Sequence, residues 1–405
     1  MKIIYITAQT PWGRGETFIL EEMLEVKRQG INLLIIPRNP PKEIFHKETK
    51  RLLENSIWLP LINLEIIINF LGSLFTKISI WKVFGTIFFH SRNPWIFLKN
   101  LAVFSKSIFV AKIIKRENIG HIHAHWGSTT ATMAYIVSKM TGIPWSLTLH
   151  RWDIVENNFL NEKVKSAEFV RIISKHGKKE LLGIVLGGNE EKVKVLHVGV
   201  KIPESVRILN EKKESFSKFT IATPANLIET KGHKYLIEAC FILVKQGIRN
   251  FQCIFYGGGP LKTELESLIR ERELTNYIKM PGAIPHEKLI KMYRNKEIDM
   301  VVLPSIITKG GEHEGIPVAL MEAMAYRIPV ISTNTGGIPE LLSNGAGIIV
   351  KEKSSEQLVE SILKVMKEEH FQRELSEKGY QRIKEEFNVE KNVKALLGLI
   401  KISKD

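Results

Sequence analysis

The sequence predicts an α/β protein with two doubly wound parallel-sheet domains. Its 405 residues are more than one hydrophobic core ordinarily holds. In both halves, short β-branched runs alternate with amphipathic stretches of helical period, which is the pattern of β-α-β units and hence of parallel sheets. We expect the N-terminal domain at residues 1–200, the C-terminal domain at 201–387, and a terminal helix at 388–405 that packs back on the first domain.

The first β-α-β unit stands at the start of the chain. Residues 2–7 are a compact β-branched run that predicts a strand, and a loop rich in glycine and proline follows at 8–15. The stretch TFILEEMLEVKRQG predicts an amphipathic helix that ends at Gly30, and INLLIIP predicts the next strand.

The second half repeats the alternation after a polar, charged segment at 201–218, where we place the domain boundary. Further helices are predicted over residues 354–401. The alternating strand and helix segments are FTIATPA, KYLIEACFILVKQG, FQCIFYG, LKTELESLIRERE, YIKMPGA, HEKLIKMYRN, IDMVVLPS, PVALMEAMAY and IPVISTN.

An apolar insertion at about residues 57–116 breaks this rhythm. It is rich in Phe and Trp and carries scattered lysines, but Pro60, Asn63, Glu65 and Asn69 interrupt it too often for a transmembrane helix. The mixture suits helices at a membrane interface. It equally suits a helical insertion that packs on the first domain with its lysines in solvent, so both interpretations stay open.

The composition is that of a soluble globular protein, with 44% hydrophobic and 25% charged residues. The net charge of +15 favours a polyanionic partner, an anionic membrane surface or anionic small substrates. The two cysteines, Cys240 and Cys253, form no CxxC motif, so a disulfide scaffold or zinc site is not expected and a reducing cytosol fits. The first residues are too short an apolar run for a signal peptide.

The segment GEHEGIPVALMEAMA, residues 311–325, joins an acidic loop with glycines to an apolar helix. We expect Pro317 at the first helical position, where its missing N–H costs nothing, so that the amides of residues 318–320 point at the loop. These amides and the helix dipole predict a phosphate-sized anion site. The residues predicted to bind the ligand of this site are Gly315, Ile316, Val318, Ala319 and Glu322.

Two glutamates flank this predicted anion site. Glu322 stands within an apolar helix, where a carboxylate needs donors, and the vicinal hydroxyls of a sugar are such donors. Glu314 precedes the helix and could address a second polyol, so the pair suggests a sugar nucleotide. Two arbitrary glutamates would more often be a solvated loop residue and an ordinary helix residue, but the Gly-x-Pro between them favours the site.

EGIPVALMEAMA resembles the signature of the retaining glycosyltransferases of family 4. Further segments of the chain agree in order and spacing: GETFILEEMLEVKRQG, HIHAHWGSTTATMAYIVSKMTGIPWSLTLH, KGHKYLIEAC, GGGPLKTELESLI and STNTGGIPELL. The resemblance is greatest to the branch that builds bacterial exopolysaccharides such as colanic acid. It implies the GT-B fold, in which two Rossmann-like domains face a central cleft and close over the substrates.

The resemblance also implies roles for single residues. Glu314 would contact the donor sugar, Glu322 the ribose, and Lys231 the donor diphosphate. His150 would reach across the cleft to the donor sugar or the acceptor, so His150, Glu314 and Lys231 are the candidate catalytic residues. From the sequence alone, Lys231 could also be a surface lysine and His150 a plain polar residue at a strand end.

Other candidates lie in glycine-rich loops. Gly13, Gly15 and Glu16 occupy the place of a family loop near the donor phosphates and the acceptor. Gly257 and Gly258 follow the strand FQCIFY and are expected to let backbone and ligand approach closely. In HIHAH, His123 and His125 face the same way, and we interpret them as core or cleft-lining residues because two imidazoles without a third ligand are a weak zinc signal.

The chain departs from the family at Asn226. Where the family has Gly-Arg, this sequence has Ala225-Asn226, so one of two expected fixed cations at the diphosphate is missing. Weaker donor binding, compensation by another basic residue and loss of transferase activity are all consistent with this change. We favour compensation because both signature glutamates and Lys231 remain.

The expected reaction is transfer of a sugar from a UDP- or GDP-linked donor to a hydroxyl of a lipid-linked glycan, with retention at the anomeric carbon. No metal or other cofactor is expected, since the chain has no Asp-x-Asp motif. The expected partners are the donor, the glycan acceptor and an anionic membrane surface, with no nucleic acid. The protein is expected in the cytoplasm, with peripheral attachment to the inner face of the membrane if the insertion binds it. Alternatives are another GT-B sugar-nucleotide enzyme, such as an epimerase, and an inactive carbohydrate- or lipid-binding relic.

Overall fold

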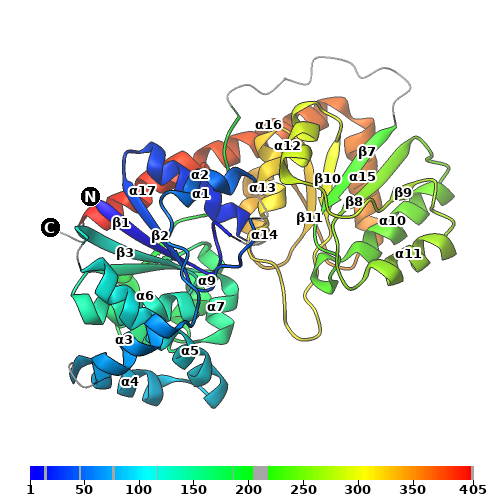
Figure 1. The fold of residues 1–405 in the computed structure, drawn as a ribbon. Coiled ribbons are helices and arrows are strands. Elements are labelled where there is room, and N and C mark those ends of the chain that lie inside the picture. The colour runs from blue at the N-terminus through cyan, green and yellow to red at the C-terminus, as the bar shows by residue number, and fades with distance from the viewer. Residues whose placement is uncertain are drawn as a thin grey trace. The chain divides into compact units, whose positions relative to one another are not determined.

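The computed structural model describes residues 1–12, 16–44, 47–74, 78–115, 117–185, 187–203 and 218–402. The chain forms two compact units (Figure 1). Unit 1 consists of Met1–Val198 together with Val389–Asp405, and unit 2 consists of Gly199–Asn388.

Unit 1 is built on a six-stranded parallel sheet with the strand order β2-β1-β3-β4-β5-β6. The chain runs from β1 outward to β2 and then returns past β1 to β3, so the strand order reverses between β1 and β3. In open α/β sheets, ligands bind beyond the carboxyl ends of the strands at such a reversal. The strands are β1 (Lys2–Thr7), β2 (Asn32–Pro37), β3 (Ile119–His125), β4 (Trp145–Leu149), β5 (Phe169–Ile172) and β6 (Val193–Val195).

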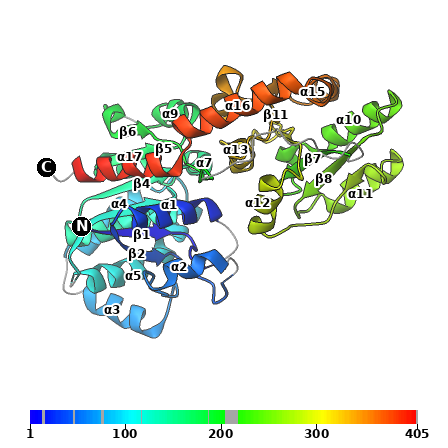
Figure 2. The same cartoon turned by 90° about the horizontal axis from the view of Figure 1, so that it is seen from above.

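Helices cover both faces of this sheet. The terminal helix α17 (Val389–Ile402) packs beside α1 (Thr17–Arg28), with Met23 and Val26 of α1 buried in one cluster with Leu396 of α17 (Figure 2). The other helices of the sheet layers are η1 (Lys47–Thr49), α2 (Lys50–Leu53), α6 (Thr129–Thr141), α7 (Arg151–Glu156), α8 (Leu160–Ser166), α9 (Lys175–Leu182) and η2 (Glu190–Lys192).

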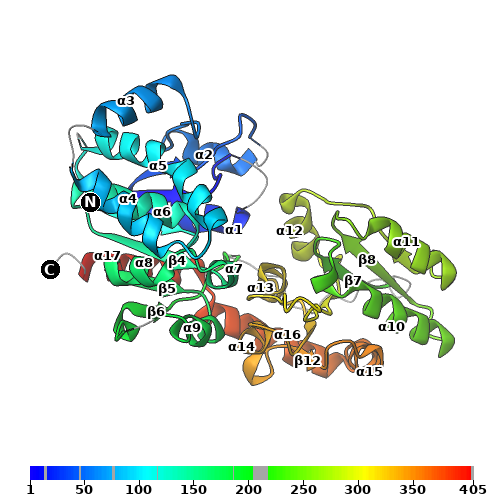
Figure 3. The same ribbon diagram turned by 90° about the horizontal axis from the view of Figure 1, so that it is seen from below.

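The apolar insertion forms three helices, α3 (Leu64–Leu74), α4 (Ile78–His90) and α5 (Pro94–Ile114). Helix α5 packs against α6 on one side and α3 on the other, so the inner faces of the insertion join the core of unit 1 (Figure 3). Lys106 of α5 is buried and donates to the carbonyls of Pro37, Arg38 and Leu59 at 2.6–2.8 Å, contrary to the expectation that the lysines lie in solvent.

The insertion also has many exposed apolar side chains. Among the described residues, no single helix combines the length and the apolar composition that a membrane crossing needs; α3 and α4 together meet these two criteria but are bent by 104°. The outer apolar face is defined here as the exposed side chains Trp58, Ile62, Leu64, Ile67, Ile68, Leu71, Ile78, Trp81, Phe88, Phe89, Trp95, Leu98 and Leu101.

Unit 2 has a second six-stranded parallel sheet, with the order β12-β11-β10-β7-β8-β9. The predicted fold class, two doubly wound parallel-sheet units, is therefore confirmed. Its strands are β7 (Phe219–Pro224), β8 (Phe251–Tyr256), β9 (Ile278–Lys279), β10 (Met300–Leu303), β11 (Val330–Thr333) and β12 (Ile348–Val350). Its helices are η3 (Glu229–Lys231), α10 (His233–Lys245), α11 (Lys262–Glu271), α12 (His286–Arg294), α13 (Val318–Ala325), α14 (Ile338–Leu341), η4 (Ser343–Gly345), α15 (Ser355–Lys367) and α16 (Glu369–Glu386).

Candidate functional site

The loop between β10 and α13 rests on two glycines of the loop after β11. Gly337 donates its amide to the Gly315 carbonyl at 3.1 Å. Gly336 has a φ of +53°, and a Cβ atom placed there would lie 1.9 Å from the Glu314 carbonyl oxygen. Only glycine permits this approach, so the TGG of the segment STNTGGIPELL holds the GEHEGIP loop in position.

Helix α13 starts one residue later than predicted. Pro317 is the N-cap, with φ −72° and ψ 118°, and the helix begins at Val318. The Leu320 amide donates to the Pro317 carbonyl at 3.2 Å, so the expectation of three amides pointing at the loop is wrong for Leu320. Val318 and Ala319 occupy the first two helical positions, whose amides have no partner within a helix.

Glu314 and Lys231 form an ion pair in unit 2. Both side chains are largely buried, and Ser305 also donates to Glu314, with 3.4 Å between the two oxygens. The contact follows from strand order, because β7 and β10 are neighbours and the turns after them meet. Gly232 shows how closely they meet: a Cβ atom there would lie 1.9 Å from the Pro304 carbonyl oxygen.

Glu322 is paired with a histidine that sequence reasoning missed. The Nε2 atom of His286, at the start of α12, lies 2.8 Å from the Glu322 carboxylate. Burial, and then the charge of Glu322, raise the pKa of the neighbouring Tyr293 hydroxyl well above its usual value. The carboxylate in the apolar helix therefore has a partner within the protein, and no local pattern in HEKLIKMYRN indicated which residue this would be.

The glycines after β8 serve the protein's own backbone. A Cβ atom at Gly257 would lie 1.9 Å from the Ala225 carbonyl oxygen, so the close approach that this glycine permits is to the loop after β7. Gly258 has open space around its Cα. Asn226 lies in the same loop as Ala225 and is exposed.

The first loop of unit 1 is organised by Glu16. Its carboxylate accepts from the amides of Gln9 and Thr10, both at 2.9 Å, and from the Trp126 indole at 2.5 Å. This carboxylate therefore ties the loop after β1 to the end of β3. Gly13 and Gly15, predicted beside it, lie outside the described residues.

A pocket of about 300 Å³ lies in unit 1 beyond the carboxyl ends of β1, β2, β3 and β4. Its charged walls are tied to neighbouring elements: Arg38 donates to the Thr129 hydroxyl at 3.0 Å, and Glu156 pairs with Lys99 of α5 at 2.8 Å. Burial raises the pKa of Asp153 in this wall to about 7, although backbone amides that donate to it act in the opposite direction. The lining residues are Ala8, Arg38, Trp126, Ser128, Thr129, Thr130, Trp152, Asp153 and Glu156.

His150, the strand-end candidate, lies directly behind this pocket wall. Its ring packs against that of Trp126 at a tilt of 32°, with ring centroids 4.3 Å apart, and its amide donates to Asp153 at 2.8 Å. The ring Nε2 atom lies 2.8 Å from that of His125. Burial lowers the pKa of His150 well below its usual value, so its ring is neutral.

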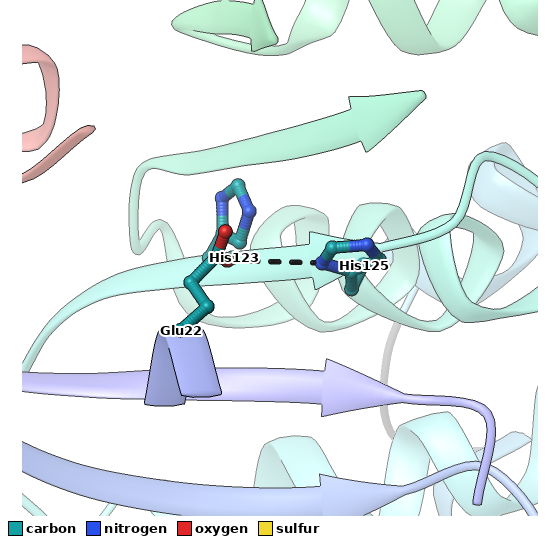
Figure 4. A group of neighbouring side chains, drawn as sticks. All are labelled: Glu22, His123 and His125. Carbon is teal, nitrogen blue, oxygen red and sulfur yellow. Dashed lines mark ion pairs between the residues drawn. The ribbon is translucent and has the colours of Figure 1, made fainter. Parts of the chain in front are cut away.

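His123 and His125 lie on one buried face of β3 with Glu22, and the three offer ligand atoms within 4.8 Å of one another (Figure 4). The chemistry of the set does not favour a metal ion. Arg171 pairs with Glu22 at 2.5 Å and would repel a cation. Both ring nitrogens of His123 lie within 2.9 Å of hydroxyl oxygens, those of Ser146 and Thr148, so these residues form a hydrogen-bonded network.

The comparisons with known proteins agree with the geometry of unit 2. Residues 206–382 match the model of the family described as glycosyl transferases group 1. This part of the chain, less than half of its length, resembles a group 1 glycosyl transferase domain. The chain is also 37% identical over 183 residues to the amylovoran biosynthesis glycosyltransferase AmsK of Erwinia amylovora.

The match to AmsK covers 45% of this chain and 44% of AmsK, so it spans less than half of the relative. Solved structures superpose over the whole chain. The glycosyltransferase of Rickettsia africae superposes with a TM-score of 0.70 at 19% identity, covering 100% of this chain and 98% of that one. Anabaena Alr3699/HepE in complex with UDP gives 0.70 at 16% identity, covering 99% and 100%. These structures share the GT-B fold with this chain, and the predicted resemblance to exopolysaccharide glycosyltransferases is confirmed.

The part of the chain that matches the group 1 family contains most of the residues predicted to bind the sugar donor. It brings Lys231 to Glu314 and places both beside the start of α13, while Glu322 faces His286 one turn further along. His150 belongs to unit 1. Sequence reasoning missed several residues of these sites, above all His286, Glu22 and Arg171. Each of them pairs with a residue far away in the chain.

Proposed function

We propose that this protein is a glycosyltransferase that moves a sugar from a nucleoside diphosphate sugar to a hydroxyl of a glycan in exopolysaccharide or lipopolysaccharide synthesis. The observation that carries the proposal is the start of α13, in the part of the chain that matches the group 1 family. Two helix-start amides, the ion pair of Lys231 with Glu314, and the Glu322–His286 pair surround it. The match to AmsK and the fold shared with HepE, a protein solved with UDP, support the same class of reaction.

In the proposed donor complex, the diphosphate binds at the amides of Val318 and Ala319, where the helix dipole favours an anion. Lys231 turns from Glu314 to the diphosphate, which frees the Glu314 carboxylate to accept hydrogen bonds from the donor sugar. Glu322, held by His286, accepts from the ribose hydroxyls. The ion pair seen here therefore holds both groups close to their proposed ligands.

The proposed reaction proceeds with retention at the anomeric carbon. As the diphosphate leaves, negative charge gathers on its oxygens while an oxocarbenium-like sugar forms, so a cation and amides aimed at the diphosphate lower the barrier. Lys231 supplies the cation, and Asn226, which can donate hydrogen bonds but has no charge, adds only neutral donors. For the missing arginine we carry forward compensation by another basic residue, because Lys231 and both signature glutamates remain.

We propose a lipid-linked glycan as the acceptor, with its terminal sugar in the pocket of unit 1. Two tryptophans, Trp126 and Trp152, offer ring faces for stacking, and the Arg38 and Glu156 side chains offer polar contacts for hydroxyls. Glu156 is tied through Lys99 to α5 of the insertion, so the pocket wall is continuous with the helices that carry the outer apolar face.

That outer apolar face supports attachment to an anionic membrane. Residues 57–74 and 78–115 include one acidic side chain, Glu65, against six lysines and arginines, of which Lys82, Arg92, Lys112 and Lys115 are exposed. Exposed tryptophans and phenylalanines with basic neighbours are typical of helices that lie in a membrane interface.

A turnover assay tests the proposal. The protein is incubated with a panel of UDP- and GDP-sugars, with and without a lipid extract, and released nucleotide is measured. Release that requires the extract supports transfer, and the anomeric proton coupling of the product, measured by NMR, reports retention. Products formed without the extract favour an epimerase or a hydrolase, and no turnover with any pair favours an inactive relic. Lys231→Met should abolish turnover, while Lys234→Met, at an exposed lysine on α10, serves as the matched control.

A further inference from the structure

A row of four side chains, three of them buried and His150 half-buried, crosses unit 1 from the sheet to the pocket wall. It consists of Arg171 on β5, Glu22 on α1, His125 at the end of β3, and His150 after β4. We infer that Glu22 and His125 are positioning residues that fix the orientation and the tautomer of His150. The catalytic meaning of this inference rests on the proposed function, because His150 supports the Trp126 wall of the proposed acceptor pocket.

Arg171 anchors the row and keeps Glu22 ionised. The guanidinium donates to the carbonyls of Leu196 and His197 at 2.8 and 2.7 Å, and its remaining amine lies 2.5 Å from Glu22. Burial alone would raise the pKa of Glu22, but Arg171 and His125 outweigh it and hold that pKa well below its usual range. Glu22 is therefore a fixed negative charge in the core.

This charge faces one nitrogen of His125. The second Glu22 oxygen lies 3.8 Å from His125 Nδ1, as the dashed line in Figure 4 marks. A carboxylate at this distance favours a proton on the facing nitrogen. In a neutral His125 ring, Nε2 then carries a lone pair and can only accept.

The Nε2 atoms of His125 and His150 are 2.8 Å apart, so one of them must donate to the other. With His125 accepting, His150 carries its proton on Nε2 and none on Nδ1. At the far end of the row, the Asp153 amide donates to the His150 carbonyl oxygen at 3.1 Å and the His150 amide donates to the Asp153 carboxylate at 2.8 Å, so the backbone of His150 is held in place. The charge of Glu22 is therefore what specifies the tautomer of both rings.

The other histidines of β3 provide the contrast. His121 and His123 lie on the same face of the strand, but both lie within hydrogen-bond distance of the Ser146 hydroxyl, and His123 also reaches that of Thr148. A hydroxyl can donate or accept, so this second row specifies no tautomer. His123 is therefore a matched control, with the same strand, face and burial as His125 but outside the row to His150.

The experiment is long-range proton–nitrogen NMR on the full chain labelled with ¹⁵N-histidine, with the signals assigned from His125→Gln and His150→Gln. His125 is expected to show its proton on Nδ1 and His150 to show its proton on Nε2. Glu22→Gln keeps the side-chain shape without the charge, and it should shift the His150 nitrogens toward a mixture of tautomers. His123→Gln should leave the His150 signals unchanged.

Because Glu22→Gln leaves the Arg171 charge buried without its counter-ion, it could unfold the protein. The variant Glu22→Gln/Arg171→Met removes both charges and keeps the test available. A wild-type His150 with its proton on Nδ1, or an unchanged His150 pattern in both Glu22→Gln forms and in His125→Gln, would overturn the inference.

The NMR result is independent of catalysis, so the two proposals fail separately. If the tautomers respond as expected and no donor and extract pair gives turnover, only the proposed function fails. If turnover occurs, Glu22→Gln should lower kcat roughly 10- to 100-fold, the loss that is typical when the partner orienting a metal-bound histidine is removed, with little change in the donor KM. Equal losses of kcat for Glu22→Gln and His123→Gln would show a merely structural role and would overturn the inference.

Discussion

Replacing Phe89 and Trp95 by serine should release the protein from anionic membranes. These side chains are 80% and 67% exposed on the outer apolar face of α4 and α5, and neither belongs to the hydrophobic core of unit 1. Their removal should therefore leave folding intact while taking away two of the apolar groups that would enter the lipid interface.

The expected size of the effect follows from these exposures. Full burial of a large apolar side chain stabilises by about 1.5–3 kcal/mol. Scaled by the two exposed fractions, the double variant should lose about 2–4 kcal/mol of binding free energy, which corresponds to roughly 30- to 700-fold weaker partition. Each lysine or arginine near an anionic surface adds about 1 kcal/mol, so the wild-type protein should also bind less to neutral vesicles and at high salt.

The assay is co-sedimentation with vesicles of phosphatidylglycerol and phosphatidylcholine, at low salt and at several mixing ratios. Ile184→Ser/Ile307→Ser is the matched control, since these side chains are 37% and 39% exposed but lie outside the insertion. The control should bind like the wild-type protein. Absence of wild-type binding to phosphatidylglycerol vesicles at low salt, or equal loss in the control, would refute the membrane argument.

The remaining predictions concern the donor site and the pocket wall. Glu322→Gln should remove the thermal shift that UDP or GDP produces, because the amide accepts less strongly from ribose hydroxyls, while circular dichroism stays unchanged. Gly336→Ala should weaken nucleotide binding at least about 10-fold in calorimetry, because its Cβ would lie 1.9 Å from the Glu314 carbonyl oxygen and push that loop away. Asp153→Asn should stabilise the protein at pH 8 more than at pH 5, as measured by urea unfolding. Burial raises the folded-state pKa of Asp153 to about 7, which lies above the pKa in the unfolded chain. The stability that the protonated carboxyl group contributes is therefore lost as the pH rises through 7. Between pH 5 and pH 8 the difference is about 2.6 kcal/mol.

Each of these has a clear contrary result. A full thermal shift in Glu322→Gln would remove the ribose role, and wild-type affinity in Gly336→Ala would show that the loop relaxes without moving the donor site. An Asp153→Asn stability gain that is the same at both pH values would mean that the carboxyl group titrates as in the unfolded chain.

Much of the fold could be predicted because strands and helices leave local periodic patterns. The run KIIYIT, which predicts a strand, forms β1, and the stretch TFILEEMLEVKRQG, which predicts a helix, contains α1. The predicted start of α13 differs from the observed start by one residue. A proline suits both the N-cap and the first helical position, and only the backbone angles of Pro317 show that it is the N-cap. The insertion could be recognised as apolar, but which side chains face the core depends on how α5 packs against α6.

The sequence by itself determined which residues carry charge, which segments form strands and helices, and that Glu314 and Glu322 flank a helix start. These are local properties, recorded in composition and in periods of two to four residues. The tertiary structure decided the partners: Lys231 with Glu314 across 83 residues, His286 with Glu322 across 36, and Arg171 with Glu22 across 149. Strand order decides which loops meet, and a local pattern shows only that a face is buried, not which side chain lies opposite it.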